Sequence, residues 1–343
     1  MKPERYKNLQ WVLIFLLIFS LPLIIGVSTG MGYIKIPFLE VFNLIFNKLF
    51  THTDINNINT VVVIDVRLPR ILTAAIVGGG LAVSGVVFQA ILLNPLADPY
   101  TLGVSTGAAF GASLAILFTI ITGTVFSVSL FAFICAVLTL FFVIYLSSGS
   151  GGISSNNLIL SGIIVSAILS AGISFIKYIA DEQVSLIIFW LMGSFSAATW
   201  ADVILTFAFV FIGFIVSVFY SRDLNLMAMG EKSASSLGVN TKQVTIILLI
   251  TASMVAAICV SVSGIIGFIG LLVPHIIRSV TGPDNRKLLP LSFLTGAIIL
   301  LSADTITRAV LPVEIPIGVL TALIGGPFFC YVFKKQHMAK RGF

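Results

Sequence analysis

Charged side chains are scarce in this chain of 343 residues, because Asp, Glu, Lys and Arg together make up only 9% of it. A soluble globular domain carries about 25% charged residues, so this composition excludes an ordinary soluble domain. Hydrophobic residues make up 58% of the sequence, and the mean hydropathy is +1.13. Both values are typical of a membrane protein with several spans.

Cysteine and histidine are also rare, with three residues of each. Cys135, Cys259 and Cys330 lie far apart within apolar runs, a pattern that indicates small core residues and excludes a disulfide framework. The sequence has no His-Glu-x-x-His motif, no Cys-x-x-Cys motif and no G-x-x-x-x-G-K-[ST] phosphate loop. We therefore expect no catalytic residue, no metal site and no cofactor bound by this chain.

Long apolar runs are abundant, and a helix needs about 20 apolar residues to cross the hydrocarbon core of a membrane. We expect ten transmembrane helices, near residues 11–30, 68–92, 101–122, 126–146, 157–179, 200–220, 242–263, 265–280, 288–311 and 316–333. The predicted fold is an all-α polytopic membrane protein, with a single transmembrane domain over residues 1–343. Gly264 and Gly267 separate the seventh span from the short eighth, and such a break is tolerated where backbone is buried in protein or lines a cavity.

The basic residues predict the orientation of the chain, whose formal net charge is +6. If successive spans alternate in direction, six basic residues fall on one side, namely Lys35, Lys48, Arg67, Arg70, Lys177 and Arg308. The other thirteen fall on the opposite side, namely Lys2, Arg5, Lys7, Arg222, Lys232, Lys242, Arg278, Arg286, Lys287, Lys334, Lys335, Lys340 and Arg341. Because cytoplasmic loops are enriched in Lys and Arg, both termini are predicted to be cytoplasmic. The basic balance thus indicates orientation, and no nucleic-acid partner is expected.

Three segments between the spans have distinct compositions. Residues 31–66 are amphipathic and carry most of the outer acids, so we expect them to pack on the outer membrane surface. Residues 181–199, with Trp190, predict a short interfacial helix. The polar segment Arg222–Asn240 contains helix-forming runs punctuated by Gly230 and Gly238, and it keeps Met and Leu among its charges. This predicts two short surface helices that offer an apolar face to a soluble partner.

Ionisable residues near the outer span ends are the first candidates for function. Arg67 and Arg70 flank Pro69 at the start of the second span, where they either anchor the helix by snorkelling or bind carboxylates of a docking protein. Asp304 and Arg308 lie four residues apart, so they can pair on one helix face. A structural pair is the favoured interpretation, and an ion relay is the alternative.

Ser105 lies in Gly103-Val-Ser-Thr-Gly107, which matches the G-x-S-x-G pattern of serine hydrolases. That chemistry requires a strand before the serine and a His–acid pair beside it, whereas the flanks here are membrane helices. Small residues also recur at Gly78–Gly80 and Gly85, where they let helices approach closely. Close packing is therefore the favoured interpretation of both glycine patterns.

Several motifs occur in a fixed order along nearly the whole chain and together resemble the FecCD-type permeases of ABC importers for iron–siderophore, haem and cobalamin. The N-terminal half contributes Arg67-Leu-Pro-Arg70 and Asn94-Pro-Leu-Ala-Asp-Pro99 with Leu102-Gly-Val-Ser. The C-terminal half contributes Gly230-Glu-x-x-Ala-x-x-Leu-Gly238, Gly267-Phe-Ile-Gly-Leu-x-x-Pro-His-x-x-Arg278, Leu289-Pro290, Ala303-Asp304 and Pro316-Ile-Gly-Val-x-Thr321.

The resemblance implies a permease in the cell (inner or plasma) membrane of a prokaryote, in contact with lipid. It implies that the subunit forms a dimer, with a second copy or a related permease, around a central pathway. Two ATP-binding cassette subunits would dock on the cytoplasmic side and bind ATP and Mg, and an extracytoplasmic substrate-binding protein would dock on the outer side. An iron–siderophore is the leading cargo, with haem, cobalamin and an oxyanion as alternatives.

The resemblance also assigns roles to individual residues. The ATPase-coupling segment 222–240 would centre on Met229, Gly230, Glu231, Ala234, Leu237 and Gly238. Binding-protein docking falls to Arg67, Arg70 and Arg308. The cytoplasmic gate would comprise Asn94, Leu96, Ser154, Ser155 and Asn156. Two other functions stay open at this point: an ion-coupled secondary transporter that uses Asp304 and Arg308, and an intramembrane hydrolase that uses Ser105.

Overall fold

The computed structural model describes residues 2–32, 34–48, 58–149, 152–310 and 313–340. The side chains of residues 2–13, 152–153, 333 and 335–340 lie outside the description. The orientation is predicted partly from basic residues at both termini. Their side chains lie outside the described part of the structure, apart from that of Lys334.

In the described residues the regular secondary structure is helical apart from one hairpin of two-residue strands, β1 (Ser148–Gly149) and β2 (Gly152–Ile153), which pair antiparallel. The first half contains α1 (Lys2–Gly30), α2 (Phe38–Phe46), α3 (Ile58–Val61), the π-helical turn η2 (Val62–Arg67), α4 (Leu68–Ile91), the 3-10 turn η3 (Pro99–Leu102), α5 (Val104–Thr122), α6 (Val128–Ser147) and α7 (Ser155–Ala180). The second half contains η4 (Asp181–Gln183), α8 (Val184–Leu191), α9 (Trp200–Phe219), α10 (Ser221–Met227), α11 (Glu231–Ser236), α12 (Thr241–Ser263), α13 (Ile269–Thr281), α14 (Asn285–Ala309) and α15 (Ile317–Lys340).

Each of the ten predicted spans overlaps one of these helices, and the number that cross the membrane stays a prediction. Among the described residues, seven helical segments are long and apolar enough to cross a membrane. The other three predicted spans correspond to shorter apolar helices, Ile14–Gly30, Ile269–Thr281 and Ile317–Val332. The hairpin β1–β2 is the one departure from an all-helical chain in the described residues, and it lies immediately before α7.

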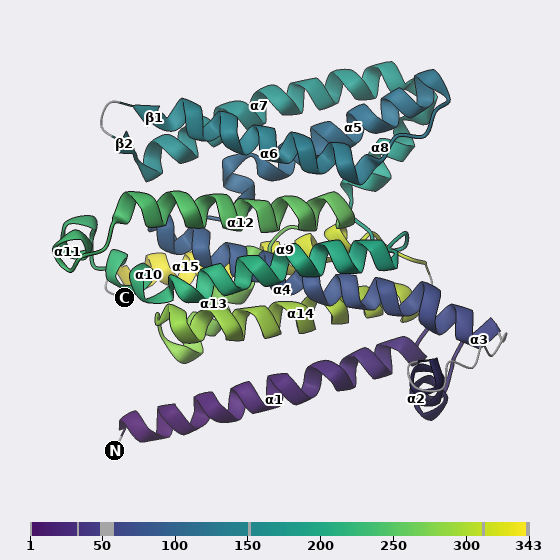
Figure 1. The fold of residues 1–343 in the computed structure, drawn as a ribbon, viewed down its shortest axis with the longest axis horizontal. Helices are drawn as coiled ribbons and strands as arrows, with labels where there is room; N and C mark the ends of the chain where they lie inside the picture. Colours follow the sequence, from purple (N-terminus) through teal and green to yellow (C-terminus); the bar gives the residue numbers. More distant parts are fainter. Residues whose placement is uncertain (1, 33, 49–57, 150–151, 311–312, 341–343) are drawn as a thin grey trace.

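The long helices lie side by side, and the loops gather at the two ends of the bundle (Figure 1). Both chain termini and α10 and α11 lie at one end, whereas α2 and α3 lie at the other. The central helix is α4, which packs against α14, α12, α9 and α13. Helices α5 to α8 form a separate group on one side, and α1 lies at the opposite edge, where it packs against α14.

Helix α4 can occupy the centre because its small residues let neighbouring backbones approach. A Cβ atom placed on Gly78 would collide with the carbonyl oxygen of Gly296 on α14, and one on Gly296 would collide with that of Gly78. A Cβ atom on Gly85 would likewise collide with the carbonyl oxygen of Gly270 on α13. Lipid gives helices no hydrophobic drive to associate, so they depend on close van der Waals contact. The glycines allow this contact, which is the packing role predicted for them.

The predicted break between the seventh and eighth spans is confirmed, because α12 ends at Ser263 and α13 begins only at Ile269. With 13 residues, α13 is about 20 Å long, too short to cross a bilayer. The backbone around the break finds partners inside the protein: Ser194 N donates to Ser263 O at 2.9 Å, and the Tyr100 hydroxyl donates to Ile266 O. Irregular backbone at membrane depth requires such partners.

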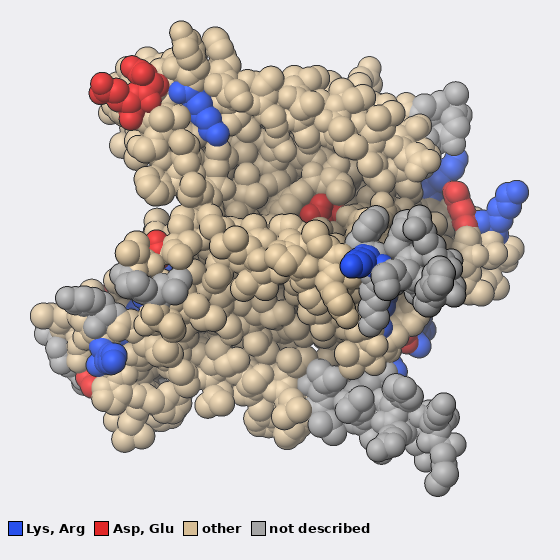
Figure 2. All heavy atoms as spheres, turned by 180° about the vertical axis from the view of Figure 1, so that it is seen from behind, with Lys and Arg blue, Asp and Glu red and all other residues tan. Residues whose placement is uncertain are grey.

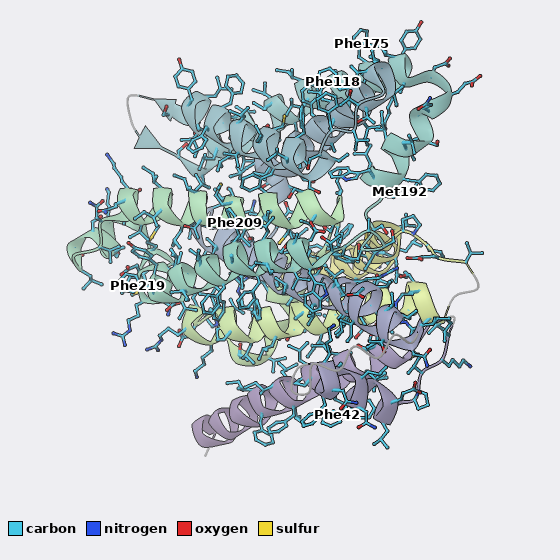
Figure 3. The ribbon with its side chains drawn as sticks, turned by 45° about the vertical axis from the view of Figure 1, so that its right-hand side comes forward. Phe42, Phe118, Phe175, Met192, Phe209 and Phe219 are labelled. Carbon is cyan, nitrogen blue, oxygen red and sulfur yellow. The ribbon has the colours of Figure 1, made fainter. Side chains whose placement is uncertain are left out.

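The face shown in Figure 2 is mainly apolar between two charged ends. Figure 2 shows Lys, Arg, Asp and Glu mainly at the two ends of the molecule, and a hollow between its two lobes. Phe118, Phe175 and Phe219 project outward from the helices (Figure 3) and are exposed in the isolated chain. This surface suits contact with lipid.

The glycine contacts generate a prediction about stability. Gly85→Val should destabilise the protein by about 3 kcal/mol, because the added side chain would push α13 away from α4 in a close-packed core. The matched variant Gly267→Ala should be tolerated, since no atom lies within 4 Å of a Cβ placed there. Thermal unfolding in detergent, followed by size-exclusion chromatography, measures both. Equal stability of the two variants would contradict this account of the core.

Candidate functional site

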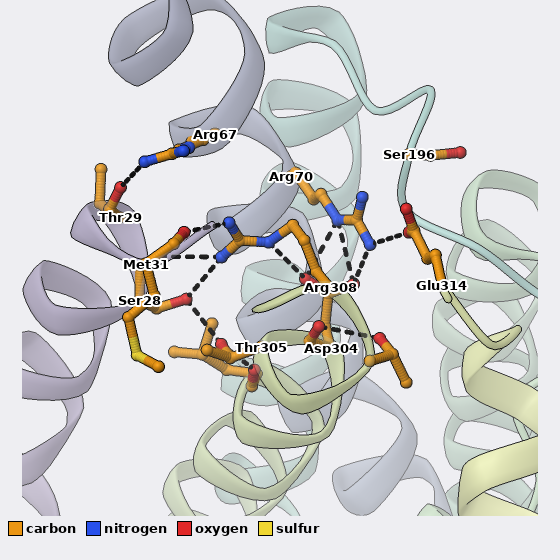
Figure 4. Close-up of polar contacts among 12 residues, drawn as sticks. Ser28, Thr29, Met31, Arg67, Arg70, Ser196, Asp304, Thr305, Arg308 and Glu314 are labelled. Atoms are coloured by element: carbon orange, nitrogen blue, oxygen red, sulfur yellow. Dashed lines mark hydrogen bonds and ion pairs between the residues drawn. The ribbon is translucent and has the colours of Figure 1, made fainter. Parts of the chain in front are cut away.

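A cluster of charged residues at the end of the bundle near α2 joins three helices. Arg70, in the first turn of α4, donates to Asp304 of α14 from both Nε and Nη2, with an Nη2–Oδ1 distance of 2.8 Å (Figure 4). The same Nη2 also donates to Glu314 in the connection between α14 and α15. The side chain of Asp304 is 1% exposed and that of Glu314 is 47% exposed. Arg70 is therefore shared by a buried carboxylate and an accessible one.

Two further arginines of the cluster hold the end of α1. Arg67 donates to Thr29 O at 2.8 Å and to Ile34 O at 2.6 Å. Arg308 donates from Nη2 to Ser28 O at 2.9 Å and from Nη1 to Met31 O. The last carbonyls of a helix have no partner within the helix, and a cation is favourable at this end of the helix dipole. The two guanidinium groups thus fasten α1 to α4 and α14.

The predicted pair of Asp304 and Arg308 is confirmed, with Arg308 Nε 4.0 Å from Asp304 Oδ2. Asp304 pairs more closely with Arg70 across the helix interface, because the Arg308 guanidinium donates to backbone oxygens at the end of α1. Simple snorkelling of Arg67 and Arg70 is wrong, since both side chains are buried. Contact of Arg67, Arg70 or Arg308 with a docked protein would require exchange of these internal bonds, and their docking role stays a prediction.

The opposite end of the bundle carries the two short helices expected within Arg222–Asn240. Helix α10 buries Leu224 against the bundle, and α11 buries Ala234. Gly230 (φ +105°) precedes α11 and Gly238 (φ +89°) follows it, and both adopt backbone conformations that disfavour other residues. The glycines therefore set the length of α11 and its angle to α10.

Apolar side chains flank α11 on the outside of the protein. Met229 is 68% exposed and Leu237 is 62% exposed, at the end of the molecule where charged residues gather. Glu231, in the first turn of α11, is also exposed, and its Oε1 accepts a hydrogen bond from Thr241 Oγ1 at 3.3 Å. This surface can bind a soluble partner through apolar contact with a charged rim.

A cavity of about 410 Å³ lies behind α11 and brings predicted coupling and gate residues together. It is lined by Glu231 of the coupling segment and by Ser154 and Ser155 at the start of α7, together with residues of α4, α10 and α12. Ser154 caps α7 by accepting a hydrogen bond from Asn157 N at 3.2 Å. Of the other predicted gate residues, Asn156, Asn94 and Leu96 do not line this cavity, although Leu93 does.

Asn94 and Leu96 form a tight turn after α4. Asn94 Oδ1 accepts from Leu96 N at 3.0 Å, which leaves the Leu96 side chain exposed. Farther along, Asp98 caps η3 by accepting from Thr101 N at 3.0 Å. Burial raises the pKa of the Asp98 carboxyl to about 6, even though this backbone hydrogen bond lowers it.

One junction was missed by sequence reasoning. Asn225 of α10 donates from Nδ2 to Asp284 Oδ1 at 2.7 Å, and its Oδ1 accepts from the backbone N and the Nδ2 of Asn285, each at 2.9 Å. Hydrogen bonds from Arg286 and then from Asn225 lower the pKa of Asp284 to about 2. The one signal in the sequence was an Asn inside a short helix, where Asn is unfavourable without a partner.

The serine of the G-x-S-x-G pattern lies in a packed interface. Ser105 is buried in α5, and within the described residues no hydrogen bond joins it to a histidine. His275 lies against Phe328 and Phe329 of α15 instead. His52 and the side chain of His337 lie outside the described residues. Packing by Gly107 against Thr139 of α6 favours the structural interpretation.

Comparison with known proteins identifies relatives along almost the whole chain. Residues 13–335 match the model of the FecCD transport family. The chain is 42% identical over 278 residues to the cobalamin import system permease protein of Halobacterium salinarum, covering 81% of this chain and 74% of the relative. It is 37% identical over 333 residues to the hemin transport system permease protein of Yersinia pestis, covering 96% of each.

A solved structure shares the fold. It is described as an inward-facing conformation of a metal-chelate type ABC transporter and is 35% identical to this chain. The TM-score is 0.81, with 94% of this chain and 98% of the other chain covered. The arrangement of helices described above is therefore that of a known transporter chain.

The buried pair at the end of α1 generates a second prediction. Asp304→Ala should destabilise the protein by about 3–5 kcal/mol, because it leaves the Arg70 guanidinium buried with one accessible partner. Glu314→Gln should cost below about 1 kcal/mol, since Glu314 is half exposed and screened by water. Thermal unfolding of both variants in the same detergent tests this. A Glu314 variant as unstable as the Asp304 variant would contradict the ranking.

Asp98 generates a third prediction, on pH. Its pKa in the folded protein is raised, so the folded state favours the protonated form and loses stability as pH rises through the range from about 4 to about 6. Asp98→Asn keeps an oxygen to cap η3 but cannot ionise. The unfolding temperature of the wild type relative to this variant should therefore fall between pH 5 and pH 7.5. A constant difference would show that burial of Asp98 has no such effect.

Proposed function

The chain belongs to the FecCD transport family, and from this premise we propose that it is the transmembrane permease subunit of an ATP-driven ABC importer. In this proposal a second copy, or a related permease, completes a translocation pathway in the cell membrane of a prokaryote. Two ATP-binding cassette subunits bind ATP and Mg on the cytoplasmic side, and an extracytoplasmic binding protein delivers the cargo. The chain itself catalyses nothing.

The observation that carries the proposal is the α10–α11 element at the end where both termini lie. It exposes Met229 and Leu237, is held at a fixed angle by Gly230, and belongs to a chain whose sequence has no phosphate loop of its own. An energy source outside the membrane can bias a two-state pathway only through a rigid contact with it. Helix α11 supplies such a contact, with Glu231, Ala234 and Gly238 shaping it.

The cavity behind α11 supports a route from this contact to the gate. Movement of α11 changes the wall formed by Glu231, and Ser154 and Ser155 on the facing wall belong to the start of α7. We place Ser154, Ser155 and Asn156 in a cytoplasmic gate, together with Asn94 and Leu96 of the turn after α4. A bulky polar cargo cannot cross hydrocarbon, so its passage depends on such a constriction opening to one side at a time.

The cargo we propose is a metal chelate, with an iron–siderophore first and haem or cobalamin next. The relatives named above for hemin and cobalamin support this class. In this proposal the binding protein docks on Arg67, Arg70 and Arg308. An acidic residue of the binding protein replaces Glu314 as the partner of Arg70. The half-exposed position of Glu314 makes it the one carboxylate of the described cluster that such a partner can replace.

Ion-coupled secondary transport through Asp304 and Arg308 is the other candidate, and the geometry does not favour it. Asp304 is bound to Arg70 by three hydrogen-bond contacts, and Arg308 is bound to the end of α1. Groups held this way lack a partner to which an ion or proton could be passed among the described residues. Uptake that continues with a hydrolysis-deficient ATPase and stops when the proton gradient is collapsed would support this candidate instead.

Leu237→Asp tests the proposed function. A charge on this exposed apolar contact should weaken association with the ATPase subunits by about 10–30-fold, as for the loss of an interface hot spot. Co-purification with the ATPase and uptake of labelled ferric siderophore into cells measure the effect. The matched control is Val125→Asp, the same kind of change at an exposed residue between α5 and α6. Equal co-purification and uptake for both variants would refute the docking role of α11.

A further inference from the structure

The junction around Asn225 connects the α10–α11 element to the start of α14. One amide makes three hydrogen bonds: it donates to Asp284 and accepts two bonds from Asn285. Asp284 is in turn the N-cap of α14, where it accepts from Arg286 N at 3.1 Å. Asn285 is 4% exposed, so its amide has no water to replace a lost partner.

Helix α14 runs from this junction to the charged cluster at the other end of the molecule. It begins at Asn285 and contains Asp304, which at 1.5 Å per residue lies about 28 Å farther along the axis. That length is close to the thickness of the hydrocarbon core. The first turn of α14 therefore contacts Asn225. Near its other end, the same helix contacts Arg70 and the end of α1.

We infer that Asn225 is a positioning residue that transmits displacement of the α10–α11 element to α14, and through α14 to the cluster of Arg70, Asp304 and Arg308. This inference rests on the proposed function, because α11 must be moved by an ATPase subunit. The buried residues of α10 are Ser221, Leu224 and Met227, and the apolar contacts of Leu224 and Met227 allow sliding. Three directional hydrogen bonds from one amide fix position along the helix axis, so α10 and the start of α14 move together.

The route has a defined consequence at the far end. A shift of α14 along its axis, together with the closely packed α4, moves Asp304, Arg308 and Arg70 relative to the carbonyls of Ser28 and Met31. The exposed Glu314, in the connection that follows α14, is bound to the Arg70 guanidinium at this point. Nucleotide state on one side of the membrane is thereby reported at the surface on the other side.

The test is hydrogen–deuterium exchange of the full chain with its ATPase subunits in lipid nanodiscs, with and without Mg-ATP and vanadate. In the wild type, nucleotide should change exchange both at α11 and at residues 26–32 and 313–320. Asn225→Ala should keep the change at α11 and lose most of the change at the distant segments. Asn43→Ala, the same substitution at an exposed residue of α2, should behave as the wild type.

A swap of side chains separates positioning from simple loss of folding. Asn225→Asp alone sets two carboxylates against each other and should abolish the distant response. The double variant Asn225→Asp/Asp284→Asn again pairs an amide with a carboxylate and leaves an acceptor for Asn285, so it should restore the response to within about twofold of the wild type. A distant response that persists in Asn225→Ala, or that the double variant fails to restore, would overturn the inference. Absence of any nucleotide effect at α11 in the wild type would instead refute the proposed function.

Discussion

Backbone amides and carbonyls inside the hydrocarbon must find partners within the protein, and the rest of this structure follows from that constraint. It explains why the long segments are helices, whose hydrogen bonds are internal. It also explains where the chain can leave helical structure. The break between α12 and α13 is hydrogen-bonded to the α8–α9 connection and to Tyr100. At the end of α1, backbone carbonyls accept hydrogen bonds from Arg67 and Arg308. At both places side chains or neighbouring backbone replace the missing helical bonds.

The same constraint decides where charge can lie at depth. Arg70 and Asp304 are tolerated because each satisfies the other, and Arg308 because backbone oxygens of α1 surround it. The cost of desolvating these groups makes the cluster a poor source of stability compared with apolar packing. Loss of Arg70 or Asp304 is nevertheless strongly destabilising, because it leaves the other charge buried. Such a cluster suits a point at which three helices must keep one relative position or change it together.

Sequence reasoning found the helices, the break at Gly264 and the two short helices after α9, because apolar length, glycine and composition are local signals. It predicted the pair of Asp304 and Arg308 but missed the closer partner Arg70, since spacing along one helix says nothing of a neighbour 234 residues away. The Asn225 junction was missed for the same reason. The two residues that Asn225 binds, Asp284 and Asn285, are ordinary polar residues of a turn, and the sequence alone does not show that α10 contacts the start of α14.

Close packing limits which parts of this chain can move independently. Helices α4 and α14 meet through reciprocal glycine contacts at Gly78 and Gly296, so neither can slide past the other without a backbone collision. Helix α13 begins after non-helical backbone and is followed by a turn at Gly282, but it is held to α4 just as closely, because a Cβ atom on Gly85 would collide with the carbonyl oxygen of Gly270. Helices α4, α13 and α14 are therefore expected to move as one body. A displacement at the Asn225 junction is then carried along α14 to the arginine cluster, since sliding between α4 and α14 cannot absorb it.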